Sequence, residues 1–214
     1  MNTVAAMHPV FSMPVHPAAE IFPMLPEEEL LELATNIKSN GLRDSIVIAA
    51  EDGIEMLIDG RNRREACKLS GVEPTTRKLP DGTDIKAYVV SANVARRHLT
   101  KGQIAMALAL IYPEPTNRGG AKNRGSIASN LGLSGELVRQ ARFVIKHKPD
   151  SVDGVMIGEL GLAAAYAEAK LGCAARRHLK QAYDRQRQTK ASATKAGAAG
   201  RSTILTRLPK RSGH

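Results

Sequence analysis

Apolar and polar positions in the first part of the chain follow two periodicities, one helical and one strand-like. Residues 27–40 begin with acidic side chains and then place apolar residues at helical spacing, which predicts a helix that ends at Gly41. Residues 45–50 are rich in β-branched side chains and predict a strand. Residues 51–53, Glu-Asp-Gly, predict a tight hairpin turn into a second strand at residues 56–58.

Helix and strand patterns continue to alternate up to about residue 98. Residues 63–70 predict a helix that ends at Gly71, and residues 85–90 predict a third strand, followed by a helix from about Ala92. By contrast, prolines recur through residues 1–25. They predict an extended, non-helical arm, although the apolar residues within it could add an edge strand.

Downstream of this unit the pattern is helical. Residues 103–112 predict a helix, and after a polar loop residues 126–146 have the spacing of a helix-turn-helix. In that motif a small residue lets the helices cross, a glycine four positions later makes the turn, and an aliphatic residue six further on seats the second helix. Ala128, Gly132 and Val138 meet these requirements. The alternative is an ordinary helical hairpin.

The last part of the chain loses its apolar pattern. Residues 151–171 predict one or two helices, but periodicity stops after Ala182, and residues 183–203 are a low-complexity mixture of small and basic residues that predicts disorder. We therefore expect four parts. They are an extended arm at 1–19, an α/β domain at 20–98, a helical domain at 99–171 and a basic, largely disordered tail at 172–214.

The distribution of charge indicates a polyanionic partner. The chain has 31 Lys and Arg residues against 21 Asp and Glu, a net charge of +10. Residues 1–95 carry 9 basic and 14 acidic side chains, residues 96–148 carry 10 and 2, and residues 171–214 carry 11 and 1. An acidic front followed by a basic middle and tail is typical of nucleic-acid-binding proteins. Aromatic residues make up only 3%, which argues against stacking as the main binding mode.

Cysteine and histidine usage indicates neither a zinc site nor a disulfide framework. Cys67 and Cys173 are isolated, and the six histidines show no metal-ligand spacing. No apolar run approaches the ~20 residues of a membrane span, and the N-terminus lacks the basic region of a secretory signal. We therefore expect a cytoplasmic protein.

A candidate phosphate site follows the second predicted strand. Residues 59–66 place Gly60 directly after an apolar run and three arginines at the start of the next helix. A glycine turn at a helix N-terminus offers backbone N–H groups to an anion, and arginine adds bidentate donors for phosphate. Asn93, Arg96 and Arg97 occupy neighbouring helix positions that could close such a site. The alternatives are a solvated basic helix start, or arginines that pair with Glu65, Asp59 or Glu55.

These motifs, in this order and ahead of a helix-turn-helix, resemble those of the ParB/sulfiredoxin superfamily, and more closely those of ParB-like proteins of plasmids and integrative elements. The family's G-[ED]-R-R-x-R-A motif is matched by residues 60–66, its E-N-x-x-R-x-x-L motif by residues 92–99, and its G-L-x-x-P-I-x-V segment by residues 41–48. The resemblance spans about residues 20–170. It implies an α+β ParB/sulfiredoxin-like domain followed by an all-α helix-turn-helix domain.

The resemblance also implies a function. ParB proteins bind CTP with magnesium, load onto palindromic DNA sites and close as sliding clamps. This chain is accordingly expected to be a CTP-responsive, sequence-specific DNA-binding protein, a homodimer in partition or regulation of a plasmid or mobile element. Since some relatives are nucleases or nucleoside triphosphatases, an enzyme of either kind is the alternative, but no catalytic or metal-binding residue is assigned. The implied nucleotide-binding residues are Gly41, Leu42, Gly60, Arg61, Asn62, Arg63, Arg64, Asn93, Arg96 and Arg97.

Three departures from the family pattern narrow this expectation. The acidic residue that the family links to metal is Ala92 here, so magnesium coordination and CTP hydrolysis are not expected to carry over. No Arg or Lys precedes Lys38, so the basic segment with which many ParB proteins stimulate a ParA ATPase is missing. The tail is too polar for the family's dimerisation domain. Cys67 follows the arginine motif and is expected to be a core residue, not a sulfiredoxin-type cysteine.

The second helix of the helix-turn-helix is the expected reader of DNA sequence. With Ser134 as its N-cap, this helix covers residues 135–146, and its apolar residues form a core-facing side. Arg139 is the candidate for a bidentate contact to guanine and Gln140 for adenine, with Arg142 and Lys146 on phosphates. The predicted DNA-binding residues are Lys122, Arg124, Ser134, Glu136, Arg139, Gln140, Arg142 and Lys146.

Overall fold

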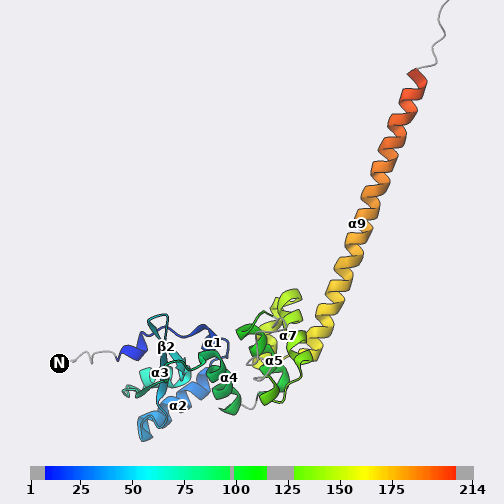
Figure 1. Cartoon of the computed structure of the whole chain (residues 1–214). Helices are drawn as coiled ribbons and strands as arrows, with labels where there is room; N and C mark the ends of the chain where they lie inside the picture. The colour runs from blue at the N-terminus through cyan, green and yellow to red at the C-terminus, as the bar shows by residue number, and fades with distance from the viewer. Residues whose placement is uncertain (1–7, 97–98, 115–127, 206–214) are drawn as a thin grey trace, which may run out of the picture. The chain divides into compact units, whose positions relative to one another are not determined.

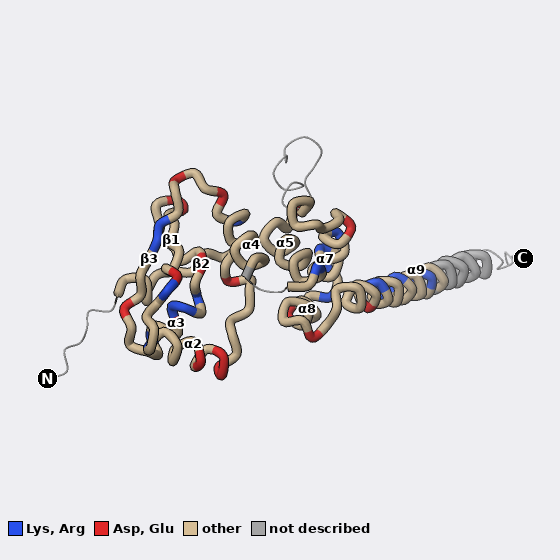
Figure 2. Tube along the Cα trace, turned by 90° about the horizontal axis from the view of Figure 1, so that it is seen from below, with Lys and Arg blue, Asp and Glu red and all other residues tan. Residues whose placement is uncertain are grey.

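A three-stranded sheet with the strand order β2-β1-β3 organises the N-terminal part of the protein (Figures 1 and 2). Strands β1 (Ile46–Glu51) and β2 (Ile54–Asp59) are antiparallel, and β3 (Thr76–Lys78) pairs with β1 in parallel. Asp52 and Gly53 both have positive φ angles, 52° and 80°, as in a type I′ turn. The predicted hairpin is therefore confirmed.

The structure is a computed structural model that describes residues 8–96, 99–114 and 128–205. For Arg96 and residues 190–205 it describes the backbone alone. The chain divides into two compact units, Met1–Tyr166 and Ala167–His214. The predicted boundary between residues 98 and 99 stays a prediction.

Helices α2 (Glu27–Asn40) and α3 (Arg61–Ser70) pack against each other through small apolar residues. Their contact is a buried cluster of Ala34, Ile37, Ala66 and Cys67. Both helices are followed by a glycine with positive φ, as their sequences predict, and α3 begins two residues earlier than predicted. The burial of Cys67 agrees with the core role predicted for it.

Residues 85–90, predicted as a strand, are helical, so this prediction is wrong. Helix α4 (Ile85–Arg96) begins after Asp84, whose Oδ1 accepts a hydrogen bond from a backbone N–H of the first turn at 3.0 Å. Val89 and Val90 are fully buried, so tertiary burial outweighs the weak strand preference of their β-branched side chains. The third strand is β3 instead, whose three residues are all exposed.

The N-terminal segment contains helical turns, so the prediction that it is extended and non-helical is wrong. These turns are η1 (Pro9–Phe11) and α1 (Pro17–Glu20), and each begins with a proline at its first position, where a missing N–H is tolerated. Only one parallel bridge, between Val15 and Leu57, represents the predicted edge strand within the described residues. His16 is buried with neighbouring apolar residues, so the segment contributes to the core.

His16 joins α1 to the turn between β1 and β2. Its Nδ1 accepts a hydrogen bond from the N–H of Ala18 at 3.1 Å, which caps the N-terminus of α1. Because an accepting Nδ1 leaves the proton of a neutral ring on Nε2, Nε2 donates to Oε2 of Glu51 at 3.0 Å. This contact holds the segment that carries Ala19 and Phe22.

The rest of the first unit is helical. Thr100 and Gln103 form a capping box at the start of α5 (Lys101–Ile111). At the start of α7 (Gly135–His147), Oγ of Ser134 accepts from the N–H of Leu137, as predicted for this N-cap residue. The predicted helices at 103–112 and 135–146 are confirmed to within two residues. The helical elements are α5 (Lys101–Ile111), α7 (Gly135–His147), η2 (Pro149–Ser151) and α8 (Val152–Ile157).

The last helix, α9 (Leu162–Leu205), continues through the segment predicted to be disordered, so that prediction is wrong (Figure 1). Ala, Lys, Arg and Gln, which dominate this segment, have high helix propensities, and an apolar face is not needed to favour helix locally. Side chains 174–189 are all exposed. Among the described residues, no helix is long and apolar enough to cross a membrane.

Candidate functional site

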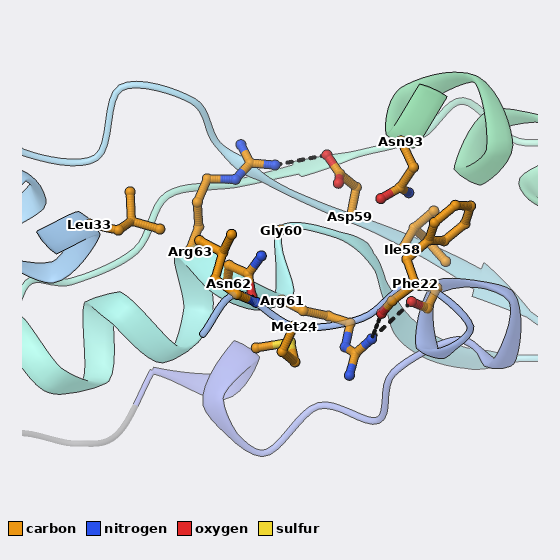
Figure 3. A pocket seen from close by; sticks show the side chains of 12 residues that line it. Phe22, Met24, Leu33, Ile58, Asp59, Gly60, Arg61, Asn62, Arg63 and Asn93 are labelled. Carbon is orange, nitrogen blue, oxygen red and sulfur yellow. Dashed lines mark hydrogen bonds and ion pairs between the residues drawn. The ribbon is translucent and has the colours of Figure 1, made fainter. Parts of the chain in front are cut away.

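A cavity of about 210 Å³ opens where β2 ends and α3 begins (Figure 3). Five segments of the first unit form its walls, namely helix α1, the connection from α1 to α2, helix α2, the junction of β2 with α3, and helix α4. The lining residues are Ala19, Phe22, Met24, Leu25, Leu33, Ile58, Asp59, Gly60, Arg61, Asn62, Arg63 and Asn93. Residues 19–25 contribute only apolar side chains to the lining, whereas the junction of β2 with α3 contributes the polar ones from Asp59 to Arg63.

Gly60 makes the turn from β2 into α3. Its backbone is left-handed, with φ 105° and ψ 26°, and it is the N-cap residue of α3, where it has no side chain to accept from the helix. No acidic side chain lies in the first turn of α3 either. The helix therefore presents its N-terminal N–H groups and the positive end of its dipole beside the cavity, an arrangement suited to an anion.

Arg61 holds one wall of the cavity in place. Its Nη1 donates to three backbone carbonyls, at 3.0 Å to Ala19, 3.3 Å to Glu20 and 2.9 Å to Phe22. Burial is the main cause that lowers the pKa of this guanidinium below its ordinary value, and the charge of Glu20 opposes the shift. Arg61 thus fixes the end of α1 and is occupied by protein groups.

Replacing Arg61 by Lys should lower the free energy of unfolding by about 2 kcal/mol, because an ammonium cannot bridge three carbonyls in this geometry. Urea denaturation of both proteins measures the difference. Arg43→Lys, the same substitution at an exposed position, is the matched control and should stay within about 0.5 kcal/mol of the unmodified protein. Equal stability of both variants would contradict this role for Arg61.

Arg63 lies directly over Gly60 and is held by three acceptors. Its Nη2 donates to Oδ2 of Asp59 at 2.7 Å, and its Nη1 donates to the carbonyls of Asp44 at 2.8 Å and Ser45 at 3.0 Å. The side chains of Arg63 and Asp59 are only 14% and 10% exposed. The pairing of Arg63 with Asp59 is one of the alternatives that the sequence left open. A phosphate at α3 would therefore compete with Asp59 for this arginine.

Arg64 does not line the cavity. Its Nε donates to Oε1 of Glu65 at 3.0 Å and its Nη1 to the carbonyl of Met13 at 2.9 Å. Asn62 accepts at Oδ1 from the N–H of Leu25 at 3.1 Å. The arginine motif therefore ties α3 to the N-terminal segment as well as bordering the cavity.

The other predicted nucleotide-binding residues lie in different places. Asn93 lines the cavity from α4, although its Nδ2 donates to the carbonyl of Val89 at 2.9 Å (Figure 3). Gly41 caps α2 and Leu42 packs against the core, so neither lines the cavity. The Arg96 side chain and all of Arg97 lie outside the described residues.

Sequence reasoning missed the apolar wall of the cavity. Phe22, Met24 and Leu25 alternate with prolines at positions 23 and 26, a spacing that indicates a linker more readily than a binding surface. The signal for them was the density of apolar residues in so short a linker. As for metals, no group of three or more His, Cys, Asp or Glu residues within the described part of the chain could hold an ion.

Helix α7 carries the residues predicted to read DNA. Residues 128–130 are helical and Gly132 has a φ of 64°, which gives the turn ahead of Ser134. Val138, Ala141 and Val144 are buried, as predicted for the core-facing side. The side chains of Glu136, Arg139 and Lys146 are exposed and that of Gln140 is partly so.

Another predicted DNA-binding residue, Arg142, makes a contact within the protein. The Nη2 and Nε atoms of Arg142 donate to the carbonyl of Tyr112 at 2.9 and 3.3 Å, so this arginine joins α7 to the end of α5. Lys122 and Arg124 lie outside the described residues. Arg142 therefore has a structural contact within the protein, and its predicted contact to a DNA phosphate stays a prediction.

On the exposed side of α7, Glu136 accepts hydrogen bonds from Arg139 and Gln140. Its Oε2 lies 2.7 Å from Nε of Arg139, and its Oε1 lies 2.5 Å from Nη2 of Arg139 and 3.0 Å from Nε2 of Gln140. These bonds, that of Arg139 first, lower the pKa of Glu136 from 4.5 to about 2. Since the folded pKa is the lower one, the ion pair is intact at neutral pH and breaks only as the pH falls through about 2.

Comparison with known proteins gives similar structures but no family assignment. No protein-family model and no curated protein matches the chain. The structure is similar to the C-terminally truncated chromosome-partitioning protein ParB from Caulobacter crescentus complexed to the centromeric parS site, with 20% identity, a TM-score of 0.39, and coverage of 73% of this chain and 83% of that one. The same protein complexed with CTP-γ-S gives 21% identity, a TM-score of 0.28, and coverage of 71% and 89%.

At these TM-scores the superpositions decide neither fold nor function, so the function has to be inferred from the residues of this chain. This chain is similar to ParB over 71–73% of its length.

Proposed function

We propose that this chain is a ParB-like, sequence-specific DNA-binding protein that responds to a nucleotide, CTP being the first candidate, in the partition or regulation of a plasmid or mobile element. One observation carries the nucleotide part of the proposal. The N-terminus of α3, which Gly60 leaves without a side-chain cap, borders a cavity with an apolar wall.

The two sides of the cavity suit the two parts of a nucleotide. Phosphate oxygens accept hydrogen bonds from backbone N–H groups at the start of a helix, where the dipole favours negative charge. Met24 and Leu25, which are partly exposed, supply apolar surface on which a sugar or base can pack, and the buried Phe22 backs this wall. The two sides are far apart in sequence but border one cavity, because Arg61 holds the two segments together.

In this proposal, nucleotide binding changes the structure through the ion pair of Arg63 with Asp59. In the structure the guanidinium is neutralised by the carboxylate at 2.7 Å. A phosphate that takes over one donor of Arg63 loosens its contacts with Asp59 and with the carbonyls of Asp44 and Ser45, which precede β1. Nucleotide binding would thereby loosen the loop between α2 and β1, which these two carbonyls belong to.

Magnesium does not fit the residues around the cavity. Asp59 is the carboxylate among the lining residues, and it is engaged by Arg63. Ala92, one residue before Asn93, has no oxygen in its side chain, so α4 adds no ligand at that position. Magnesium favours carboxylate and phosphate oxygens as ligands. Among the residues that line the cavity, the one carboxylate is that of Asp59, which is already paired with Arg63. No step of the proposed function uses a metal ion.

For DNA, α7 is the proposed recognition helix of a helix-turn-helix. The glycine turn at Gly132, the Ser134 cap and the buried apolar side of α7 support this assignment. A single recognition helix contacts only a few base pairs, so selective binding favours a homodimer on an inverted repeat.

Isothermal titration with CTP, ATP and GTP, each with and without duplex DNA, tests the nucleotide site. We expect one nucleotide, CTP first, to bind with a dissociation constant below the millimolar range. No binding of any of the three at millimolar concentration, with or without DNA, would refute it. Cleavage of supercoiled plasmid, or hydrolysis of the nucleotide in the same samples with added magnesium or manganese, would favour an enzyme instead.

A further inference from the structure

An acidic residue is hydrogen-bonded to both side chains that are proposed to read bases on α7. Glu136 accepts two hydrogen bonds from Arg139 and one from Gln140, and all three side chains lie in the first two turns of the helix. The Glu136 and Arg139 side chains are 52% and 59% exposed, so the contact is not a by-product of core packing. We call this group the Glu136 clamp.

The clamp engages one edge of the Arg139 guanidinium and leaves the other edge without a contact to Glu136. Glu136 occupies Nε and one position of Nη2, the side edge of the guanidinium. Among the described residues, the other edge, formed by Nη1 and Nη2, has one long contact, 3.4 Å from Nη2 to the hydroxyl of Tyr166. A bidentate contact to the O6 and N7 atoms of guanine needs two parallel donors, and this second edge provides them.

Tyr166 is itself held in place from the other side. Its ring packs edge-on against Phe143 of α7, with ring centroids 5.3 Å apart. The hydroxyl therefore reaches Arg139 from a fixed ring, at a distance too long for a strong bond. It supports the guanidinium without competing effectively with a base.

From these contacts we infer that Glu136 is a positioning residue for sequence readout, which fixes Arg139 for guanine at the cost of weaker binding to DNA in general. The inference rests on the proposed function. The cost arises because Glu136 places a negative charge on the surface that approaches the phosphates, and it offsets the charge of Arg139. The low pKa of Glu136 keeps this charge present at every pH at which the protein would be assayed.

The alternative role for Glu136 is a simple N-terminal charge that stabilises α7 through the helix dipole. That role predicts a small loss of stability on substitution and no change in sequence preference. The positioning role predicts opposite changes in two affinities, which no general loss of structure produces.

The test compares Glu136→Ala with the unmodified full-length protein in site selection from random duplex DNA, followed by affinity measurements on the selected site and on random DNA. We expect affinity for random DNA to rise by up to about tenfold at 0.1 M salt, as for one added phosphate contact. We expect discrimination at one guanine per half-site to fall by at least about fivefold, the lower end for a bidentate contact.

Glu159→Ala is the matched control, since it removes one exposed negative charge from the same unit at a position outside α7. It should not relax the selected motif. Tyr166→Phe keeps the ring contact and removes the hydroxyl, and it should leave the guanine preference unchanged. Loss of the guanine preference in Tyr166→Phe but not in Glu136→Ala would show that Tyr166, and not Glu136, positions Arg139, and would overturn the inference.

The clamp itself is visible without DNA in the ¹H–¹⁵N spectrum of arginine Nε–H groups. The Arg139 Nε–H signal, assigned by its loss in Arg139→Lys, should exchange slowly in the unmodified protein and be lost to exchange in Glu136→Ala. An identical signal in both proteins overturns the inference, as does an identical selected motif. The unmodified protein could also select no sequence although its Arg139 Nε–H signal is protected. In that case the clamp exists but the proposed sequence-specific function is refuted, and the positioning role of Glu136 is refuted with it.

Discussion

Replacing Gly60 by Ala should abolish nucleotide binding and lower the free energy of unfolding by about 1–3 kcal/mol, the cost of a side chain in strained left-handed backbone. Gly60 has a φ of 105°, and an added Cβ would lie 3.1 Å from Nη2 and 3.2 Å from Nε of Arg63. The guanidinium cannot simply move aside, because Asp59 and two carbonyls hold it. The substitution therefore disturbs both the turn and the cation beside the cavity. Titration calorimetry with CTP and urea denaturation measure the two effects.

Gly53→Ala separates backbone strain from the disturbance of the site. Gly53 also has a positive φ, 80°, but an added Cβ there would have no heavy atom within 4 Å. This control should lose stability through strain and keep its nucleotide affinity. If Gly60→Ala binds nucleotide as tightly as Gly53→Ala does, the start of α3 is not the phosphate site.

The position of the candidate site could be predicted from local sequence, but the partners of its side chains could not. A glycine between an apolar run and a helix is a local signal, and the turn at Gly60 follows from it. The acceptors of Arg61 and Arg64 are main-chain carbonyls of Phe22 and Met13, 39 and 51 residues away. Every residue has a backbone carbonyl, so a sequence does not show which carbonyl accepts from a given arginine. Residue types alone therefore could not distinguish phosphate-binding arginines from structural ones.

The secondary-structure predictions are correct where the signal is local and wrong where distant contacts decide the structure. Helix α2 and the β1–β2 hairpin carry their own boundary signals, an acidic first turn in one case and an Asp-Gly turn in the other. Helix α4 contains Val89 and Val90, whose β-branched side chains favour a strand until they are buried by the rest of the fold. Strand β3 has no apolar pattern, since it lies at the edge of the sheet with all three residues exposed.

The tail has the second large expected effect. Truncation after Leu171 should weaken binding to random duplex DNA by at least about 100-fold at 0.1 M salt and flatten its salt dependence. The reason is that the slope of log affinity against log salt falls by about 0.9 for each phosphate that the protein no longer neutralises. Residues 171–214 carry 11 basic side chains and 1 acidic one. In the part of α9 whose side chains are described, Arg176, Arg177 and Lys180 are exposed. Figure 2 shows that basic residues recur along this helix.

Because α9 is helical, the truncation removes basic residues with a defined spacing as well as a number of charges. A disordered tail would contribute charge wherever it reached, whereas α9 presents its cations on a continuous helix, so their number and spacing both contribute. Replacing Arg176, Arg177 and Lys180 by Gln retains helix propensity and removes only charge, and should lower the salt slope by up to about 2.7. Sequence preference should survive in both variants, because phosphate contacts carry no base information. A salt slope unchanged by truncation would show that the tail does not neutralise DNA phosphates. Leu179 and Tyr183, exposed on the same helix, are where contacts to a protein partner would then be tested.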